Sequence, residues 1–362
     1  MDSRSQTIDK HISSIVHGPS SPAIEITDLT GIATLQDLGR RGWNKFGVPA
    51  SGPMDWFAHR AANQLLDNHP NAAVLEIGMG DAAFRALRDC VLAVTGAGFE
   101  VENYVWTFPL WTSFYVRAGW RVHVKKTSGG NWAYLAIAGG FDSPVIMGSR
   151  STYLRGGLGQ IMRVGEHLQA GKPADELLKL AARNFLFVGQ DLSCPHGTQD
   201  KSRGRNSMPY TQSPIIEVIP APQSDWFTAE GIRTFYESEY TLSPAFDRMG
   251  YRLELLPTML LSPSPAKAIT KKVTKELISE GMTLGSIQIP ADGQPIVMMA
   301  DAPTTGGYPK IANVTRASLP LLAQCEAGVS RIRFRETTTE AAQENYYVIA
   351  RSALFATKQS PY

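Results

Sequence analysis

The chain has 362 residues, 43% of them hydrophobic and 19% charged, and a formal net charge of +2 at pH 7. This length favours two domains, each able to bury a hydrophobic core. The nearly neutral charge gives no indication of nucleic acid or an anionic membrane as a partner, and no apolar run approaches the roughly 20 residues of a membrane-spanning helix. Cys90, Cys194 and Cys325 are far apart and odd in number, which argues against a disulfide framework and favours a cytoplasmic protein.

The first half of the chain reads as short β-type segments. Residues 1–23 are polar and lack an apolar signal core, so we expect a flexible tail there. From residue 24 onward several segments alternate apolar and polar residues, as strands with one buried face do. A helix is predicted over residues 57–68, because Phe57, Ala61 and Leu65 recur at helical spacing. Strands are predicted at residues 73–78, 91–95, 113–117, 121–125 and 134–138.

The second half follows a segment without apolar pattern, residues 194–213, which is predicted to be a linker. Helices are predicted around residues 274–280 and 319–326, and a last one from Thr337 through residue 354, with Glu340 at capping-box spacing. Because strands outnumber helices and no βαβ rhythm occurs, the sequence predicts a mostly β protein with few helices and two β-barrel-like domains. Strands are predicted at residues 215–219, 251–256, 286–290, 295–300 and 331–334. The expected division is a first barrel at 24–193, a second at 214–336 and a C-terminal helix and tail at 337–362.

Two motifs imitate functional sites. GMGDAA (residues 78–83) resembles a dinucleotide fingerprint, but the six residues that separate it from the next strand are too few for a parallel crossover. A turn between antiparallel strands is therefore favoured. Ser264 and Lys267 have the spacing of a Ser-Lys nucleophile, yet they lie in a proline-rich loop rather than on a helix. The seven histidines are scattered, and no metal site is predicted.

Two glycine-rich segments favour a ligand site. TTGGYPK (residues 304–310) follows an apolar strand and Asp301, and its glycines allow backbone N–H groups to approach an oxyanion. A tight β-turn is the alternative. GSRSTY (residues 148–153) also follows a buried strand, and Arg150 offers a planar fork for a carboxylate or carbamate. A hairpin in which Arg150 binds loop carbonyls explains this second segment almost as well.

Further motifs carry a resemblance to a known family. They are TLQDLGR (34–40), GVPASGPMD (47–55), AIAGGF (136–141), DRMGYRL (247–253), GSIQIPADGQPIVMMAD (285–301) and TTGGYPKIA (304–312). With these motifs in collinear order, the chain is identified as a member of the KipA family, also called allophanate hydrolase subunit 2. This family includes the C component of bacterial 5-oxoprolinase and the A/B part of the carboxyltransferase domain of urea carboxylase.

The resemblance implies two cyclophilin-like β-barrels and a partner. The partner is a KipI-type carboxyltransferase C/D chain, similar to the B component of 5-oxoprolinase, and the family's active site lies where the two halves meet. Covalently bound cofactors are not expected; ATP or carboxybiotin is supplied through partner subunits. The implied substrates are small molecules with an amide or ureido group.

Chemistry on an amide needs a group that stabilises a developing oxyanion and a group that exchanges a proton. On that basis Asp301, Tyr308 and Lys310 are the predicted catalytic residues. The predicted substrate-binding residues are Thr304, Thr305, Gly306, Gly307, Arg248, Tyr251, Arg150, Ser151 and Thr152.

The chain departs from the family pattern at several positions, which leaves four hypotheses open. The first is a subunit of an ATP-dependent 5-oxoprolinase-type hydrolase, and the second is a biotin-dependent carboxyltransferase acting on urea or a related amide. The third is a regulator that binds a KipI-type kinase inhibitor, and the fourth is a stand-alone enzyme with a closed, apolar pocket beside Tyr308. The departures are Trp120, Gln160, Glu166, Lys172, Phe246 and Leu255.

Overall fold

The computed structural model describes residues 20–185, 210–256, 268–273 and 277–352. It confirms the predicted mostly β class and several of the predicted strands. Strand β1 already begins at Ser21, inside the segment expected to be a tail. Most of the predicted linker, together with Ser264 and Lys267, lies outside the described residues.

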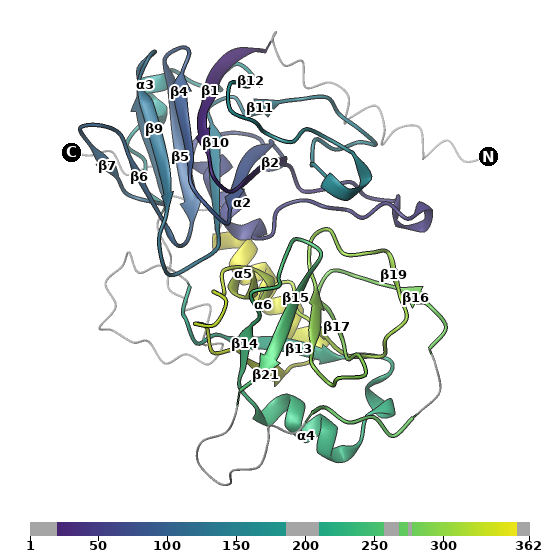
Figure 1. Ribbon diagram of the computed structural model, residues 1–362. Coiled ribbons are helices and arrows are strands. Elements are labelled where there is room, and N and C mark those ends of the chain that lie inside the picture. Colours follow the sequence, from purple (N-terminus) through teal and green to yellow (C-terminus); the bar gives the residue numbers. More distant parts are fainter. Residues whose placement is uncertain (1–19, 186–209, 257–267, 274–276, 353–362) are drawn as a thin grey trace.

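Two antiparallel sheets form the upper body in Figure 1. The 7-stranded sheet has the order β11 (Phe141–Asp142), β12 (His167–Ala170), β1 (Ser21–Leu29), β4 (Ala82–Ala86), β9 (Arg121–Lys126), β6 (Phe99–Glu102), β7 (Thr107–Phe108). The 5-stranded sheet has the order β2 (Ile32–Gln36), β3 (Val74–Gly78), β10 (Trp132–Ile137), β5 (Cys90–Gly96), β8 (Thr112–Val116).

Strand β10 explains how the upper body is layered. All its residues are buried, and successive side chains of a strand point to opposite faces of the sheet. Leu135 therefore joins the core between the two sheets, whereas Trp132 and Tyr134 join a second core on the other face of the 5-stranded sheet. This second core continues into the lower body, so the two bodies share buried apolar contacts.

Helix α2 (Trp56–Leu65) covers that second face and confirms the predicted helix. It begins after Asp55, whose carboxylate accepts hydrogen bonds from the N–H groups of Phe57 and Ala58 at 3.1 and 2.9 Å. Figure 1 shows α2 and α5 (Leu319–Ala323) between the upper sheets and the lower sheet. The helix thus lies at the junction of the two bodies.

The lower body contains a 7-stranded sheet in which only the pairing of β13 with β21 is parallel. Its order is β14 (Tyr240–Leu242), β15 (Gly250–Leu255), β18 (Ile296–Met298), β17 (Ser286–Gln288), β20 (Lys310–Val314), β13 (Ile215–Pro220), β21 (Arg333–Glu336). A small ladder joins β16 (Glu280–Gly281) to β19 (Thr305–Gly306). The remaining helical segments are α3 (Leu177–Leu180), α4 (Ala229–Glu237), α6 (Thr339–Ser352), η1 (Asn44–Phe46), η2 (Leu154–Gly156) and η3 (Ser224–Trp226).

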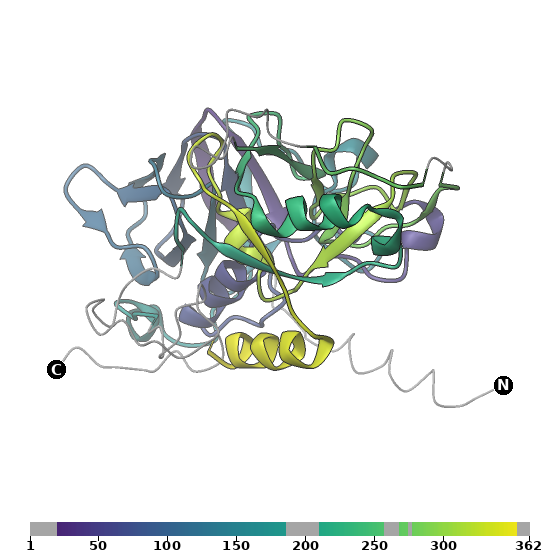
Figure 2. The ribbon, with the colours of Figure 1, turned by 90° about the horizontal axis from the view of Figure 1, so that it is seen from below.

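Helix α6 contacts both bodies from the outside. Figure 2, which views the molecule from below, shows α6 along the lower edge of the picture, outside the sheets. The ring of Tyr346 lies 5.3 Å from that of Trp56, and the Asn345 amide donates to Glu217 of β13 at 3.0 Å. Within the described residues no helix is long and apolar enough to cross a membrane.

Three local predictions need correction. The predicted helix around residues 274–280 is wrong for residues 277–280, which the structure describes. They are not helical, and Glu280 pairs in strand β16. The predicted capping residue at the start of α6 is Thr337. The hydroxyl that accepts a hydrogen bond there belongs to Thr338 instead, and its donor is the N–H of Ala341. The GMGDAA turn is present without a nucleotide-binding helix, but it connects β3 and β4, which belong to different sheets rather than to one antiparallel pair.

Candidate functional site

A cleft of about 380 Å³ lies on the outer face of strands β15, β18 and β17. Alternate residues of a strand lie on the same face of a sheet, so Gly250 and Arg252 of β15 both lie on the cleft face. Their partners on β18 are Met298 and Ile296, respectively, and these four residues form the floor. Met298 also belongs to a small apolar cluster with Met282 and Ala302. The floor is therefore largely apolar, with a charged side chain at one end.

The wall of the cleft comes from several distant segments. Tyr308, from the connection between β19 and β20, is 49% exposed and lines one side. Arg155 of η2 reaches across from the upper body and donates to Asp247 at 3.2 Å. The cleft thus includes residues from both bodies, and the predicted catalytic Tyr308 is one of them.

The rest of the TTGGYPK segment is partly strand rather than the ligand-binding loop that the sequence predicts. Thr305 and Gly306 form strand β19, and Lys310 is the first residue of β20. The ammonium of Lys310 lies 2.7 Å from the Glu280 carboxylate and donates to the Gly281 carbonyl at 3.2 Å. Lys310 is 8% exposed and is absent from the residues that line the cleft, so this cation is neutralised behind it.

A buried ion network lies at the junction of the bodies. Arg248 donates to both carboxylate oxygens of Asp301, at 2.8 and 3.1 Å, to Glu76 of β3, and to the Gly52 carbonyl at 2.7 Å. Desolvation lowers the pKa of Arg248, but attraction by Glu76 and Asp301 outweighs it and raises that pKa. The arginine is therefore a permanent buried cation that joins the two bodies.

The same network continues toward α2. Tyr134 donates to Glu76 at 2.8 Å and accepts the N–H of Asp55 at 2.7 Å. Burial raises the pKa of Asp55 to about 6, although hydrogen bonds from Ala58, Gln324 and Tyr210 to the carboxylate oppose the rise. Asp55 is consequently a buried carboxyl that titrates near neutrality.

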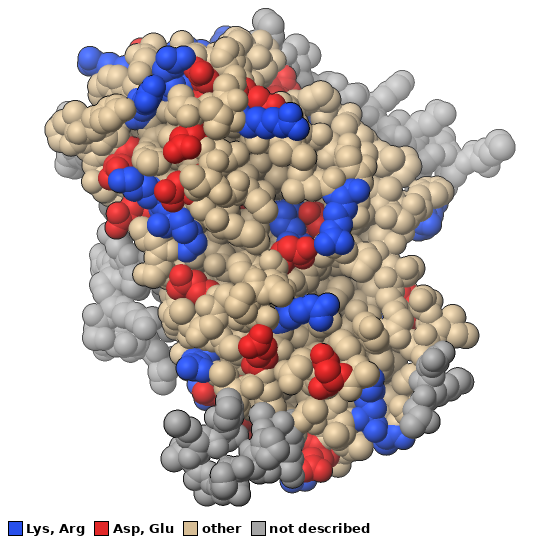
Figure 3. All heavy atoms as spheres, in the orientation of Figure 1, with Lys and Arg blue, Asp and Glu red and all other residues tan. Residues whose placement is uncertain are grey.

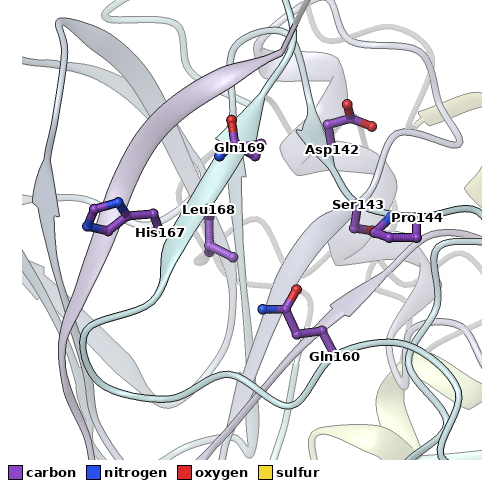
Figure 4. Close-up of a pocket in the computed structure, with 7 residues that line it drawn as sticks. All are labelled: Asp142, Ser143, Pro144, Gln160, His167, Leu168 and Gln169. Carbon is purple, nitrogen blue, oxygen red and sulfur yellow. The ribbon is translucent and has the colours of Figure 1, made fainter.

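The predicted Arg150 segment forms a separate site in the upper body. Asp37 accepts hydrogen bonds from the hydroxyls of Ser149 and Ser151 and from the Arg150 N–H, at 2.5, 2.7 and 2.7 Å. The Arg150 guanidinium pairs with Asp142. Asp142 lines a second pocket of about 370 Å³, shown in Figure 4. The other residues that line it are Ser143, Pro144, Gln160, His167, Leu168 and Gln169.

Of the remaining predicted substrate contacts, Tyr251 and Thr152 are engaged inside the protein, whereas Thr304 is half-buried and Gly307 is exposed. The Tyr251 hydroxyl donates to the Ala323 carbonyl at 3.0 Å and accepts the Trp132 indole N–H at 2.8 Å, fully buried. Thr152 donates to the Gln160 carbonyl at 3.2 Å. The carbonyl of Thr304 accepts the N–H of Met282 at 2.9 Å, and Gly307 follows strand β19. Their part in substrate binding stays a prediction.

The structure brings together only part of the predicted set. Asp301 and Arg248 are bonded to each other, Tyr308 lies at the cleft, and the Arg150 segment lies elsewhere. Sequence reasoning missed Glu76, whose signal was a carboxylate inside a strongly apolar strand. It also missed the cleft residues Arg155, Asp247, Arg252 and Gln288. Among the described residues no group of His, Cys, Asp or Glu side chains is arranged to hold a metal ion.

The surface around this site carries no large patch of one charge. Figure 3, in the orientation of Figure 1, shows lysine and arginine interspersed with aspartate and glutamate on this face. Such a surface matches the nearly neutral net charge of +2. It favours recognition by local groups in a pocket over long-range attraction of a highly charged polymer.

The chain belongs to the family described as the carboxyltransferase domain, subdomain A and B, whose model matches residues 46–336. It is 34% identical over 320 residues to the C component of 5-oxoprolinase from Haemophilus influenzae, a match that covers 88% of this chain and 93% of the relative. This relative is an enzyme subunit. The comparisons therefore confirm the family resemblance and the similarity to the C component of 5-oxoprolinase.

Two larger proteins are more distant relatives. The chain is 30% identical over 325 residues to a putative urea carboxylase of Emericella nidulans, a match that covers 87% of this chain and 24% of that protein. The crystal structure of the K. lactis urea amidolyase has the same fold, with a TM-score of 0.77 at 23% identity over 99% of this chain and 21% of that one. This chain spans only about a quarter or less of either protein.

Proposed function

We propose that this protein is the A/B subunit of an ATP-dependent, 5-oxoprolinase-type amide hydrolase that acts with a KipI-type C/D partner. The observation that carries the proposal is the match to the C component of 5-oxoprolinase over 93% of that protein. ATP reaches the reaction through the partner subunits, and no covalently bound cofactor is required of this chain. We assign the two bodies to two cyclophilin-like barrels, the first of which includes β1 from Ser21.

The cleft supplies groups suited to lactam chemistry. Hydrolysis of a lactam develops negative charge on the carbonyl oxygen and requires a proton for the leaving nitrogen. Of the three predicted catalytic residues, Tyr308 reaches the cleft, and its hydroxyl is a donor for either atom. Asp301 and Lys310 act indirectly: Asp301 fixes Arg248 at the junction, and Lys310 ties β20 to β16.

Reconstitution tests the proposal directly. This chain, a KipI-type partner and a third subunit are combined, and ATP consumption is measured with and without 5-oxoproline. We expect 5-oxoproline-dependent ATP hydrolysis, reduced at least about 10-fold in kcat by Tyr308→Phe, since one hydrogen bond to a developing charge contributes that much or more. The control is Tyr104→Phe at an 83% exposed position of the β6–β7 hairpin, expected to have no effect. Absence of turnover in an assembled complex would reject the proposal.

Carboxyl transfer from carboxybiotin to urea or a related amide is the second candidate function. It is favoured by the family description and by the likeness to a putative urea carboxylase. Bicarbonate-dependent activity that avidin abolishes would support it over hydrolysis. The cleft beside Tyr308, lined by arginine, aspartate and glutamine, differs from the closed, apolar pocket expected of a stand-alone enzyme.

A further inference from the structure

The charges of the cleft do not balance. Its charged side chains are Arg155, Asp247 and Arg252. Asp247 is already satisfied: Oδ1 accepts the N–H groups of Met249 and Gly250 at 2.8 and 3.2 Å, and Oδ2 accepts Arg155. Across the described ranges, Arg252 has no ion pair and no side-chain hydrogen bond. One cation therefore faces the cleft without a partner.

Arg252 belongs to a row of side chains that crosses three neighbouring strands. Ile296 of β18 lies opposite Arg252 of β15 and also opposite Gln288 of β17. Opposite residues in antiparallel strands point to the same face, and adjacent strands lie about 4.8 Å apart, so the Cα atoms of Arg252 and Gln288 are separated by roughly 10 Å. A guanidinium and a carboxamide thus lie on the same face of the sheet, on either side of the apolar Ile296.

The Gln288 amide is oriented by the protein. Its Nε2 donates to the Tyr308 carbonyl at 3.2 Å, which leaves Oε1 as the acceptor. An amide oxygen next to the cleft is complementary to an N–H donor. A guanidinium is complementary to a carboxylate, which it binds through two parallel hydrogen bonds.

We propose that Arg252 and Gln288 form a subsite for a small carboxylate that also carries an amide N–H, with Arg252 binding the carboxylate and Gln288 accepting the N–H. Arg155 is the second cation: its exposed pair with Asp247, 64% and 49% exposed, exchanges readily for a ligand carboxylate. The inference rests on the proposed function and specifies which substrate this cleft selects. A neutral ligand such as urea leaves Arg252 unpaired.

Binding of two related probes tests the subsite. Isothermal titration measures the affinity of the complete complex, without ATP, for 5-oxoproline and for its neutral analogue 5-oxoprolinamide. We expect the wild type to prefer the carboxylate by about 10- to 100-fold, the range of a hydrogen bond to a charged group. Arg252→Gln should lower this preference to the part that Arg155 still provides, by weakening only 5-oxoproline binding, and Arg252→Lys should restore part of the loss. Gln288→Leu should weaken both probes alike.

The matched control is Arg333→Gln, an arginine on β21 of the same sheet that is 51% exposed and does not line the cleft. It should leave both affinities unchanged. If Arg252→Gln keeps the full wild-type preference for the carboxylate, or if the wild type binds neither probe, the subsite is refuted. If binding depends on Arg252 but the complex never hydrolyses ATP with 5-oxoproline, the subsite stands and the proposed hydrolase function falls.

Discussion

Replacing Arg248 by methionine removes the cation that joins the two bodies. Arg248 and Asp301 belong to the lower body, whereas Glu76 and the Gly52 carbonyl belong to the upper one. Their side chains are almost inaccessible, with 5% exposure for Arg248 and 0% for Glu76. In Arg248→Met both carboxylates stay buried without their common partner.

The expected loss of stability follows from this burial. Removing one partner of a buried ion pair costs about 3–5 kcal/mol, because the remaining charge stays desolvated. Burial raises the pKa of Glu76, so protonation of this stranded carboxyl limits the cost and the deficit should shrink as the pH falls from 7 toward 5. The exposed pair of Arg333 and Glu239, 3.8 Å apart with both side chains 51% exposed, should cost only about 0–1 kcal/mol when broken.

Urea denaturation followed by tryptophan fluorescence measures both values. We expect a clear fall of the unfolding midpoint for Arg248→Met and almost none for the Arg333→Gln control. A triple variant, Glu76→Gln with Arg248→Met and Asp301→Asn, should recover part of the loss, because none of the three replaced side chains then carries a buried charge. A loss below about 1 kcal/mol in Arg248→Met, independent of pH, would refute the reasoning.

Two further predictions concern Asp55 and Gly98. Because the pKa of Asp55 is raised from 3.8 to about 6, its proton contributes stability that is fully present below about pH 4 and lost as the pH rises through 6. Asp55→Asn, which keeps a capping side chain, should therefore flatten the pH dependence of unfolding in that window; an unchanged slope would show that Asp55 titrates normally. Gly98→Ala should lower Tm strongly, since φ is +75° and the new Cβ would lie 2.4 Å from the Gly130 carbonyl oxygen. Gly148→Ala, with φ +80° and open space, should cost only about 1 kcal/mol, and equal losses in the two variants would contradict the steric argument.

Local sequence patterns predicted the central strands and α2, because β3, β5 and β10 are short, nearly continuous apolar runs and α2 carries apolar residues at helical spacing. Strand β10 and helix α2 are built from apolar residues at positions that face a core. Helix α4 was missed, since only Gly231 and Phe235 of its residues are buried. The wrong helix near residue 280 lies where the chain pairs as β16 with β19, a contact that no local pattern reports.

The candidate site was only partly predictable for the same reason. The TTGGYPK motif located Tyr308, but its neighbour Lys310 is neutralised by Glu280. Because glycines, hydroxyls and a lysine follow one another in this segment, the sequence predicts a single ligand-binding loop. Strands β19 and β20 take up part of the segment, however, and successive side chains of a strand point to opposite faces. Glu76 lies in a strand that is buried at every position, so its carboxylate meets partners from elsewhere in the chain.

The sequence by itself determined the β class, the positions of the central strands and the motifs that place the chain in its family. These properties depend on residues close together in the chain, where periodicity and spacing are readable. Only the tertiary structure decided which polar groups meet: Arg248 with Glu76 and Asp301, and Arg252 with Gln288 across Ile296. Such pairings depend on strand register and on the burial of charges, and both are set by the packing of segments far apart in the sequence.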